Sequence, residues 1–237
     1  MNNRAIFFVD ANNWYHNLKN WIRPGDIDIC KVADLIAKEK HLSVAEIRWY
    51  VSMPDIKENP LVYQRQRKFL WWLENKGVNI ITRKLQRLST KELRKKREDF
   101  IESWDLCEQC KPIVAESFLD ISDHHQKEKG IDVWIAIDIV KEAINNNLDC
   151  AVLISGDADF VPALNLTKKS GKEVFSCSVP RGYSNELRQK FPYRILGRDF
   201  LNMCLREQKE LKKENTNFKQ KLEREPLLDE EINKIIK

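Results

Sequence analysis

The sequence predicts an α/β fold in which a central parallel sheet carries helices on both faces. Strand-like apolar runs alternate along the chain with segments whose apolar residues have helical spacing, an order typical of repeated β-α-β units. The strand-like runs are apolar nearly throughout, as in residues 149–155 (DCAVLIS). Such runs are typical of strands that are buried on both faces, as they are in a parallel sheet.

Five strands and five helices are predicted in alternating order. The strands are expected at residues 4–10, 46–52, 78–85, 149–155 and 172–179. The helices are expected at residues 30–39, 60–77, 131–146, 160–171 and 184–191. Pro60 near the start of one helix, Gly77 after its end and Gly171 at the end of another are typical helix-boundary residues.

Two segments interrupt this alternation and suggest the domain organisation. Residues 86–128 are basic at first and then contain Cys and His, so they form an insertion. Residues 205–237 are charged and mostly helical in pattern, with Pro226 as an interruption. We therefore expect one domain over residues 1–204 and a helical C-terminal extension over 205–237. Packing on the domain, pairing with another copy or a partner protein, and fraying are alternatives that stay open for the extension.

The composition is that of a globular protein, with 42% hydrophobic and 32% charged residues in 237. No apolar stretch approaches the ~18 residues that a membrane span needs, and the N-terminus lacks the pattern of a signal peptide. We expect a cytoplasmic protein with no membrane association. Six cysteines in such a chain favour free thiols or a metal site over a disulfide framework. The absence of a Gly-rich phosphate loop argues against a nucleotide-driven enzyme.

The positive charge is concentrated in one segment. Residues 83–97 contain eight Lys or Arg and one Glu, so they carry +7, whereas the whole chain carries +5. A basic segment on a nearly neutral body is typical of a phosphate-binding surface. A solvated face of a charged helix explains the same pattern equally well.

Aspartates lie at matching ends of the predicted elements. Asp10 ends the first strand, Asp157 follows strand 149–155 with Asp159 two residues later, and Asp132 opens the preceding helix. Ligands of open parallel sheets collect at the carboxyl ends of strands, near the point where the strand order reverses. If the first and fourth strands are neighbours, these carboxylates converge, and their mutual repulsion then calls for a cation. Hard oxygen ligands select Mg²⁺ or Mn²⁺ over zinc.

Each of these aspartates also has an alternative structural role. Asp10 and the asparagines that follow it could form a polar strand-to-helix turn. Asp159 is a natural N-cap for the helix after it, and Asp132 suits a first helical turn. Asp138 is expected on a different helix face, because six residues place it about 240° round the helix from Asp132.

Three motifs together resemble a known family. FVDANN, KGIDVWIAIDIV and LISGDADF, in this order and on these elements, resemble the NYN domains, PIN-like nucleases of the LabA-like group, over roughly residues 4–200 apart from the insertion. The resemblance implies a PIN-like fold and metal-dependent cleavage of RNA. The acidic, Mg²⁺- or Mn²⁺-binding positions that it implies are Asp10, Asp132, Asp157 and Asp159. The supporting polar positions that it implies are Asn13, Asp138 and Ser155.

An endoribonuclease that acts on single-stranded or structured RNA is therefore the function expected. Its metal would position a water and stabilise charge at the scissile phosphate. The basic residues expected to bind RNA are Arg83, Lys84, Arg87, Arg94, Lys95, Lys96, Arg97 and Arg181. Arg188 and Lys190 could line the same edge or be solvated helix charges.

Two other function classes are alternatives to the nuclease. One is a catalytically weak RNA-binding regulatory module that uses the same cleft. The other is a phosphotransfer enzyme with Asp10 as nucleophile, which is disfavoured because Asn12 occupies the position of the second aspartate in the commonest such motif.

The insertion contains a candidate zinc site. Cys107 and Cys110 have the Cys-x-x-Cys spacing of a zinc knuckle, and His124 and His125 offer a second pair of ligands. A single Cys-x-x-Cys is half of a site, and adjacent histidines seldom both reach one ion. Structural Zn²⁺ and unpaired thiols are therefore both open.

Overall fold

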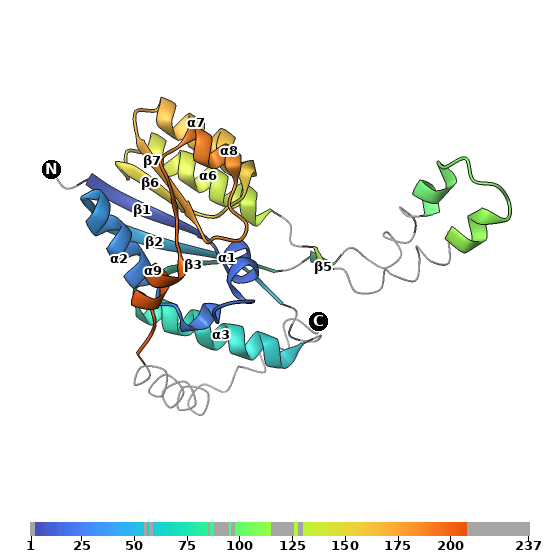
Figure 1. The fold of residues 1–237 in the computed structure, drawn as a ribbon, viewed down its shortest axis with the longest axis horizontal. Helices are drawn as coiled ribbons and strands as arrows, with labels where there is room; N and C mark the ends of the chain where they lie inside the picture. Colours follow the sequence, from blue (N-terminus) through green and yellow to red (C-terminus); the bar gives the residue numbers. More distant parts are fainter. Residues whose placement is uncertain are drawn as a thin grey trace.

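A six-stranded parallel sheet forms the centre of the computed structural model (Figure 1). The structure describes residues 3–207 apart from 55, 57–58, 85, 88–94, 96–97, 115–125 and 128–129. In the order β3-β2-β1-β6-β7-β8, the strands are β3 (Asn79–Lys84), β2 (Leu42–Met53), β1 (Asn3–Asp10), β6 (Cys150–Ile154), β7 (Glu173–Ser178) and β8 (Tyr193–Ile195). Every neighbouring pair is parallel. The α/β class with a parallel sheet is confirmed.

Helices cover both faces of the sheet (Figure 1). The helices of one layer are α1 (Ala11–Leu18), α2 (Ile29–Lys40), α3 (Pro60–Asn75) and α9 (Arg198–Met203). The helices of the other layer are α6 (Ile131–Ile144), α7 (Val161–Lys169) and α8 (Asn185–Lys190). Two short 3-10 turns, η1 (Pro24–Asp26) and η2 (Ala158–Phe160), precede α2 and α7. The structure is thus a three-layer sandwich of helices, sheet and helices.

The central strands contribute side chains to both cores. In β1, Phe7 and Val9 pack in the core beneath α1–α3, whereas Ile6 and Phe8 pack in the core beneath α6 and α7. Successive residues of a strand point to opposite faces, so a strand covered on both sides is apolar at every position. This explains the continuous apolar runs from which these strands were predicted.

The strand order reverses between β1 and β6. After β1 the chain adds β2 and then β3 on one side, and it returns to place β6, β7 and β8 on the other. Val9 of β1 lies opposite Ile154 of β6, so the carboxyl ends of these two strands lie side by side. The condition set for convergence of the aspartates, that the first and fourth predicted strands be neighbours, is therefore met.

Among the helices and strands of the three layers, α1, β8 and α9 were not predicted from the sequence. Helix α1 buries only Ala11, Trp14 and Leu18, too few apolar residues to separate a helix from a polar turn. Strand β8 has three residues, and α9 has six, so each contains fewer than two full periods of its hydrophobic pattern. Strand β2 also begins at Leu42, four residues before the predicted start, in a stretch that is only partly buried.

The insertion leaves the sheet after β3 and returns before α6. Two-residue strands β4 (Gln86–Arg87) and β5 (Gln126–Lys127) pair antiparallel at its base. Residues 98–102 and 110–114 are helical and lie apart from the three layers in Figure 1. The expected boundaries of the insertion therefore enclose this paired base.

The first residues of the expected C-terminal extension contact the domain. Leu205 forms a β-bridge with Ile27, and the backbone N–H of Arg206 donates to the carbonyl of Asp26. The Arg206 guanidinium lies 3.6 Å from the ring centroid of Trp72. Residues 208–237 lie outside the described part, so the helical extension and its role in oligomerisation stay predictions. Within the described residues, no helix combines the length and apolarity needed to cross a membrane.

A buried charge network joins β2 to α6. Arg48 donates to Glu46 at 2.8 Å and to Glu142 at 3.1 Å, and it lies 3.9 Å from Asp138. The Tyr50 hydroxyl donates to Asp138 at 2.8 Å. Burial alone would lower the pKa of Arg48, but the hydrogen bond and charge of Glu46 outweigh it and raise that pKa. Burial, followed by the bond to Asp138, raises the pKa of Tyr50, so its hydroxyl stays a donor.

Arg48→Met should lower the free energy of unfolding by about 3 kcal/mol, because it leaves buried carboxylates without their cation. Only 13% of the Arg48 side chain and 8% of the Glu142 side chain are exposed. Arg4→Met is the matched control, since Arg4 forms an exposed ion pair with Asp149 and should lose about 1 kcal/mol or less. Urea denaturation of both variants is the measurement. Equal losses would show that burial does not strengthen the network.

Candidate active site

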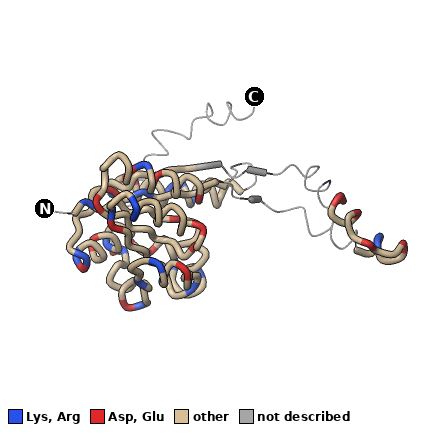
Figure 2. The backbone as a smooth tube through the Cα atoms, turned by 90° about the horizontal axis from the view of Figure 1, so that it is seen from above, with Lys and Arg blue, Asp and Glu red and all other residues tan. Residues whose placement is uncertain are grey.

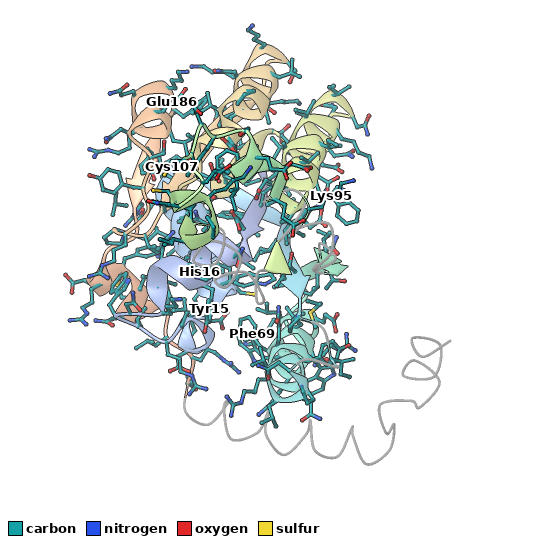
Figure 3. The ribbon with its side chains drawn as sticks, turned by 90° about the vertical axis from the view of Figure 1, so that its right-hand side faces the viewer. Tyr15, His16, Phe69, Lys95, Cys107 and Glu186 are labelled. Carbon is teal, nitrogen blue, oxygen red and sulfur yellow. The ribbon has the colours of Figure 1, made fainter. Side chains whose placement is uncertain are left out.

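The candidate site lies at the carboxyl ends of β1 and β6, where the strand order reverses. Figure 3 looks onto this edge, with Tyr15 and His16 of α1 between Phe69 of α3 and Glu186 of α8. Asp10 is the last residue of β1, and residues 155–159 follow β6 directly. Both predicted acidic segments are therefore at one edge of the sheet.

Asp10 is buried and fixed by three donors. Its Oδ1 accepts the backbone N–H groups of Asn12 at 3.1 Å and of Asn13 at 3.0 Å, which makes Asp10 the N-cap of α1. Its Oδ2 accepts the Ser155 hydroxyl at 3.0 Å. Only 4% of Asp10 is exposed. The polar strand-to-helix turn considered for this residue is observed, and it places the carboxylate at the β1–β6 boundary.

Ser155 and Asn13 connect the two strand ends. The Ser155 hydroxyl, which donates to Asp10, also accepts the backbone N–H of Asp157 at 3.2 Å. The Asn13 side-chain oxygen accepts the backbone N–H of Gly156 at 3.1 Å and the amide of Asn17 at 3.1 Å. Both residues therefore lie where supporting polar positions were expected, and they fix the loop after β6 against α1.

Asp157, and not Asp159, is the capping residue after β6. The Asp157 carboxylate accepts the backbone N–H of Asp159 at 2.9 Å and caps η2. Asp159 is exposed within η2, and α7 begins at Val161 after Phe160, without a side-chain cap. The suggestion that Asp159 caps α7 is therefore wrong. An intervening 3-10 turn moves the capping residue two positions toward the N-terminus.

The two aspartates of α6 face different surroundings. Asp132 is exposed in the first turn of the helix, after Gly130 in a left-handed conformation with φ 82°. Asp138 is half-buried and accepts the Tyr50 hydroxyl. Tyr50 lies opposite Asp10 in the β1–β2 register. Asp138 thus belongs to the charge network beneath the edge, on a different helix face from Asp132, as the helical spacing predicted.

The edge offers oxygen donors of the type that Mg²⁺ and Mn²⁺ prefer. They are the carboxylates of Asp10 and Asp157, the Ser155 hydroxyl and the exposed carboxylates of Asp132 and Asp159. In the part of the chain that the structure describes, no three His, Cys, Asp or Glu side chains lie close enough together to form a metal-ligand set. The donor types fit a hard cation, and a complete coordination sphere stays a prediction.

Comparisons with known proteins agree with this fold and these motifs. The sequence profile of the NYN domain matches residues 4–196. This chain belongs to the NYN domain family. The NYN domain places it in the PIN-like nuclease superfamily.

Two individual proteins resemble this NYN domain. The uncharacterized protein MJ0482 of Methanocaldococcus jannaschii is 34% identical over 90 residues, which are 38% of this chain and 37% of that protein. A crystal structure of a protein of unknown function from Vibrio parahaemolyticus, VPA0982, superposes with a TM-score of 0.55 at 17% identity. The superposition covers 86% of this chain and 97% of the Vibrio chain. The second likeness concerns the fold alone.

The basic residues of this NYN domain are only partly described. Arg83 and Lys84 belong to β3, and Arg87 to β4, with their side chains outside the described part. Lys95 is exposed, while Arg94, Lys96 and Arg97 lie outside the described residues. Figure 2 shows Lys and Arg interspersed with Asp and Glu over the layered domain. The described surface is thus of mixed charge, and binding of RNA by the basic segment stays a prediction.

Arg181 lies in the loop between β7 and α8 and is exposed. This loop packs on the site, as the glycine contacts below show. In the following helix, Lys190 donates to Glu186 at 2.6 Å, and Arg188 lies over the Tyr183 ring. Arg181 therefore belongs to the β7–α8 loop, and Arg188 contacts Tyr183 of the same loop.

The Cys-x-x-Cys pair is exposed. The backbone N–H of Cys110 donates to the Cys107 sulfur at 3.4 Å, and both thiols are free. The hydrogen bond of the Cys110 side chain, followed by that of its backbone N–H, lowers the pKa of Cys107. His124 and His125 lie outside the described residues, so the four-ligand zinc site stays a prediction.

Two glycines allow the loops of this NYN domain to touch, and this contact was not predicted. A Cβ on Gly156 would collide with the carbonyl oxygen of Gly182 and lie 3.2 Å from Cα of Tyr183. Gly182 has φ +83°, and a Cβ there would meet the Asn17 side chain. The β7–α8 loop therefore lies directly against the loop after β6 and against α1. The SGD motif in the sequence marks Gly156 but not its contact with a loop 26 residues later.

Gly156→Ala should lower the free energy of unfolding by about 2 kcal/mol or more, because the new methyl group has to displace backbone atoms. Gly25→Ala is the matched control, since a Cβ there would meet only a ring carbon of Phe69 at 3.9 Å. It should change stability by less than about 0.5 kcal/mol. Thermal or urea denaturation compares the two variants. A Gly156→Ala protein as stable as the parent would contradict the described loop contact.

Proposed function

We propose that this NYN domain is a metal-dependent endoribonuclease that hydrolyses phosphodiester bonds at the β1–β6 edge. The observation that carries the proposal is the link through Ser155, whose hydroxyl contacts both the Asp10 carboxylate and the backbone of Asp157. Membership of the NYN family and the PIN-like superfamily supports nuclease chemistry. This link joins the acidic residues of the first and third motifs, Asp10 and Asp157, although they come from distant parts of the chain.

The residues of the edge divide into an inner and an outer set. Asp10 and Ser155 are buried and hold each other in place. Asp157 is half-buried, and Asp132 and Asp159 are exposed. The outer carboxylates face solvent, from which a polyanionic substrate and its cations approach. The inner set fixes the backbone that carries them.

The metal proposed is Mg²⁺ or Mn²⁺, held by Asp10, Asp132, Asp157 and Asp159. When bound, such an ion supplies charge stabilisation at the phosphate oxygens and a more acidic water. The chain itself contributes orientation. Asp10 is fixed by three hydrogen bonds, and Asp157 is fixed through its backbone bond to Ser155 and its side-chain bond to Asp159.

A catalytically weak RNA-binding module is the alternative, because both Asp10 and Asp157 also perform capping roles that need no metal. The phosphotransfer reading has less support. Both oxygens of Asp10 already accept hydrogen bonds, and the residue is only 4% exposed, which is unfavourable for a nucleophile. A cleavage assay with RNA, DNA and phosphomonoester substrates separates the three.

Asp157→Asn should abolish Mg²⁺- or Mn²⁺-dependent RNA cleavage while leaving the melting temperature equal or higher. Asparagine retains an oxygen that can accept the Asp159 N–H, but it removes a charge that the cation requires. Stability is kept or raised because fewer carboxylates repel each other at the edge. Gel-based cleavage and thermal denaturation are the two measurements.

Asp149→Asn is the matched control, since Asp149 lies just before β6 and Asp157 just after it. Asp149 is paired with Arg4 at the opposite edge of the sheet, so its variant should cleave like the parent. An Asp157→Asn protein that cleaves normally but is destabilised would show that this residue serves only as a cap.

We further propose that the basic segment at residues 83–97 binds the RNA backbone. Its charge of +7 contrasts with the mixed charge of the layered domain (Figure 2). Its first residues, Arg83 and Lys84, end β3, whose carboxyl end points toward the same edge as those of β1 and β2. The segment thus starts at the edge of the sheet that carries the acidic residues.

Replacing Arg94, Lys95, Lys96 and Arg97 with Glu should weaken RNA binding for all sequences and reduce its salt dependence, because fewer phosphate counterions are released. Fluorescence anisotropy over a range of salt concentrations gives both quantities. Replacing Lys38, Lys141, Lys168 and Lys169, in the last turns of α2, α6 and α7, with Glu is the control for net charge, because it also reverses four cations. If the first variant has the affinity and salt dependence of the parent, the segment does not bind RNA and its charges belong to a solvated helix face.

A further inference from the structure

The backbone of an exposed tyrosine lies beside the acidic loop. Tyr183 is 43% exposed, and it follows Gly182, whose backbone packs on Gly156. Gly156 is the residue before Asp157. The position of the Tyr183 backbone is therefore determined by the same contact that positions the loop after β6.

The ring of Tyr183 has a cationic partner, and the residues that follow it form a capped helix. The Arg188 guanidinium lies 5.4 Å from its ring centroid. Helix α8 begins directly after it, where the Ser184 hydroxyl accepts the backbone N–H of Leu187 at 3.2 Å and the Leu187 side chain is buried. Tyr183 is thus anchored on one side by the glycine contact and on the other by a capped helix.

We propose that Tyr183, together with Arg188, is a stacking platform that binds one unpaired base of a single-stranded RNA next to the 155–159 loop. Aromatic rings and Arg planes bind bases by stacking, which a base-paired duplex does not permit. Single exposed aromatic residues are common on protein surfaces. Tyr183 is distinguished by its backbone contact with the acidic loop and by its paired guanidinium. The platform extends the proposed endoribonuclease function by assigning a substrate class to the same edge.

Tyr15 provides an internal comparison. It is 52% exposed, and Lys19 lies 6.0 Å from its ring centroid, so its side chain and its cationic partner resemble those of Tyr183. It lies two positions after Asn13, which contacts Gly156. At about 100° per residue, Tyr15 points about 160° away from Asn13 around α1. It should therefore contribute little to binding at the acidic loop.

The experiment measures binding of a short single-stranded RNA oligonucleotide by fluorescence anisotropy in EDTA, so that cleavage does not interfere. Tyr183→Ala and Tyr183→Leu should each weaken binding about tenfold, whereas Tyr183→Phe should stay within about twofold of the parent. Tyr15→Ala should also stay within about twofold. Tyr183→Leu keeps apolar bulk, so it separates loss of the ring from a local packing defect.

Two further probes identify the interaction as stacking. An oligonucleotide of the same length with abasic sites should bind the parent and Tyr183→Ala equally, because only the backbone is left to contact. The matching RNA duplex should bind the parent more weakly than the single strand. The proposal is overturned if the parent does not bind the single strand, if Tyr183→Ala binds it like the parent, or if the loss persists on the abasic probe.

Failure of the platform and failure of the nuclease proposal are distinguishable. Cleavage of the same oligonucleotide by the parent in Mg²⁺ or Mn²⁺ is measured separately, with Asp157→Asn as the inactive variant. Binding that depends on Tyr183 without cleavage supports the platform and contradicts the nuclease. Cleavage that depends on Asp157, with binding that is independent of Tyr183, supports the nuclease and contradicts the platform.

Discussion

The pairing of β1 with β6 is the interaction on which the candidate site depends. These two strands are the point at which the sheet grows outward in both directions, so the connections that follow them leave toward opposite sides. Asp10 ends β1, Ser155 follows the end of β6, and the two bond to each other across the boundary. Parallel pairing thus brings the acidic residues together, and one hydroxyl group sets the spacing between them.

Helix α6 supports the edge with two kinds of charged residue. Asp132 is exposed in its first turn, whereas Asp138 and Glu142, one turn apart, face β2 and contact Arg48. The negative charges of Asp138 and Glu142 are compensated by the Arg48 guanidinium, and Asp138 also accepts a hydrogen bond from the Tyr50 hydroxyl. The helix therefore carries acids that contact a buried guanidinium on one face and an exposed aspartate in its first turn. Asp132 and Asp138 therefore have different surroundings although they belong to one motif, because they lie on different faces of α6.

The sequence predicted what depends on local pattern and missed what depends on contacts between distant residues. The central strands were predictable because burial on both faces leaves continuous apolar runs, and the acidic edge was predictable because Asp10 and Asp157 follow two of those runs. The Tyr50–Asp138 bond joins residues 88 positions apart, and no local pattern encodes it. The contact between Gly156 and Gly182 was hidden for the same reason. The capping role was assigned to Asp159 instead of Asp157 because a 3-10 turn has no hydrophobic period that would reveal it.

The separation of the two halves of the site along the chain has a consequence for when the site forms. The Asp10–Ser155 bond spans 145 residues, so a chain emerging from the ribosome can fold β1, β2 and β3 long before β6 exists. The entropy cost of closing such a loop grows only with the logarithm of its length, which is why an insertion between β3 and α6 is tolerated. Formation of β1–β6 contacts is a late, non-local step of the kind that slows folding. The acidic edge is therefore absent from the nascent N-terminal half and is completed only when the second half of the sheet joins it.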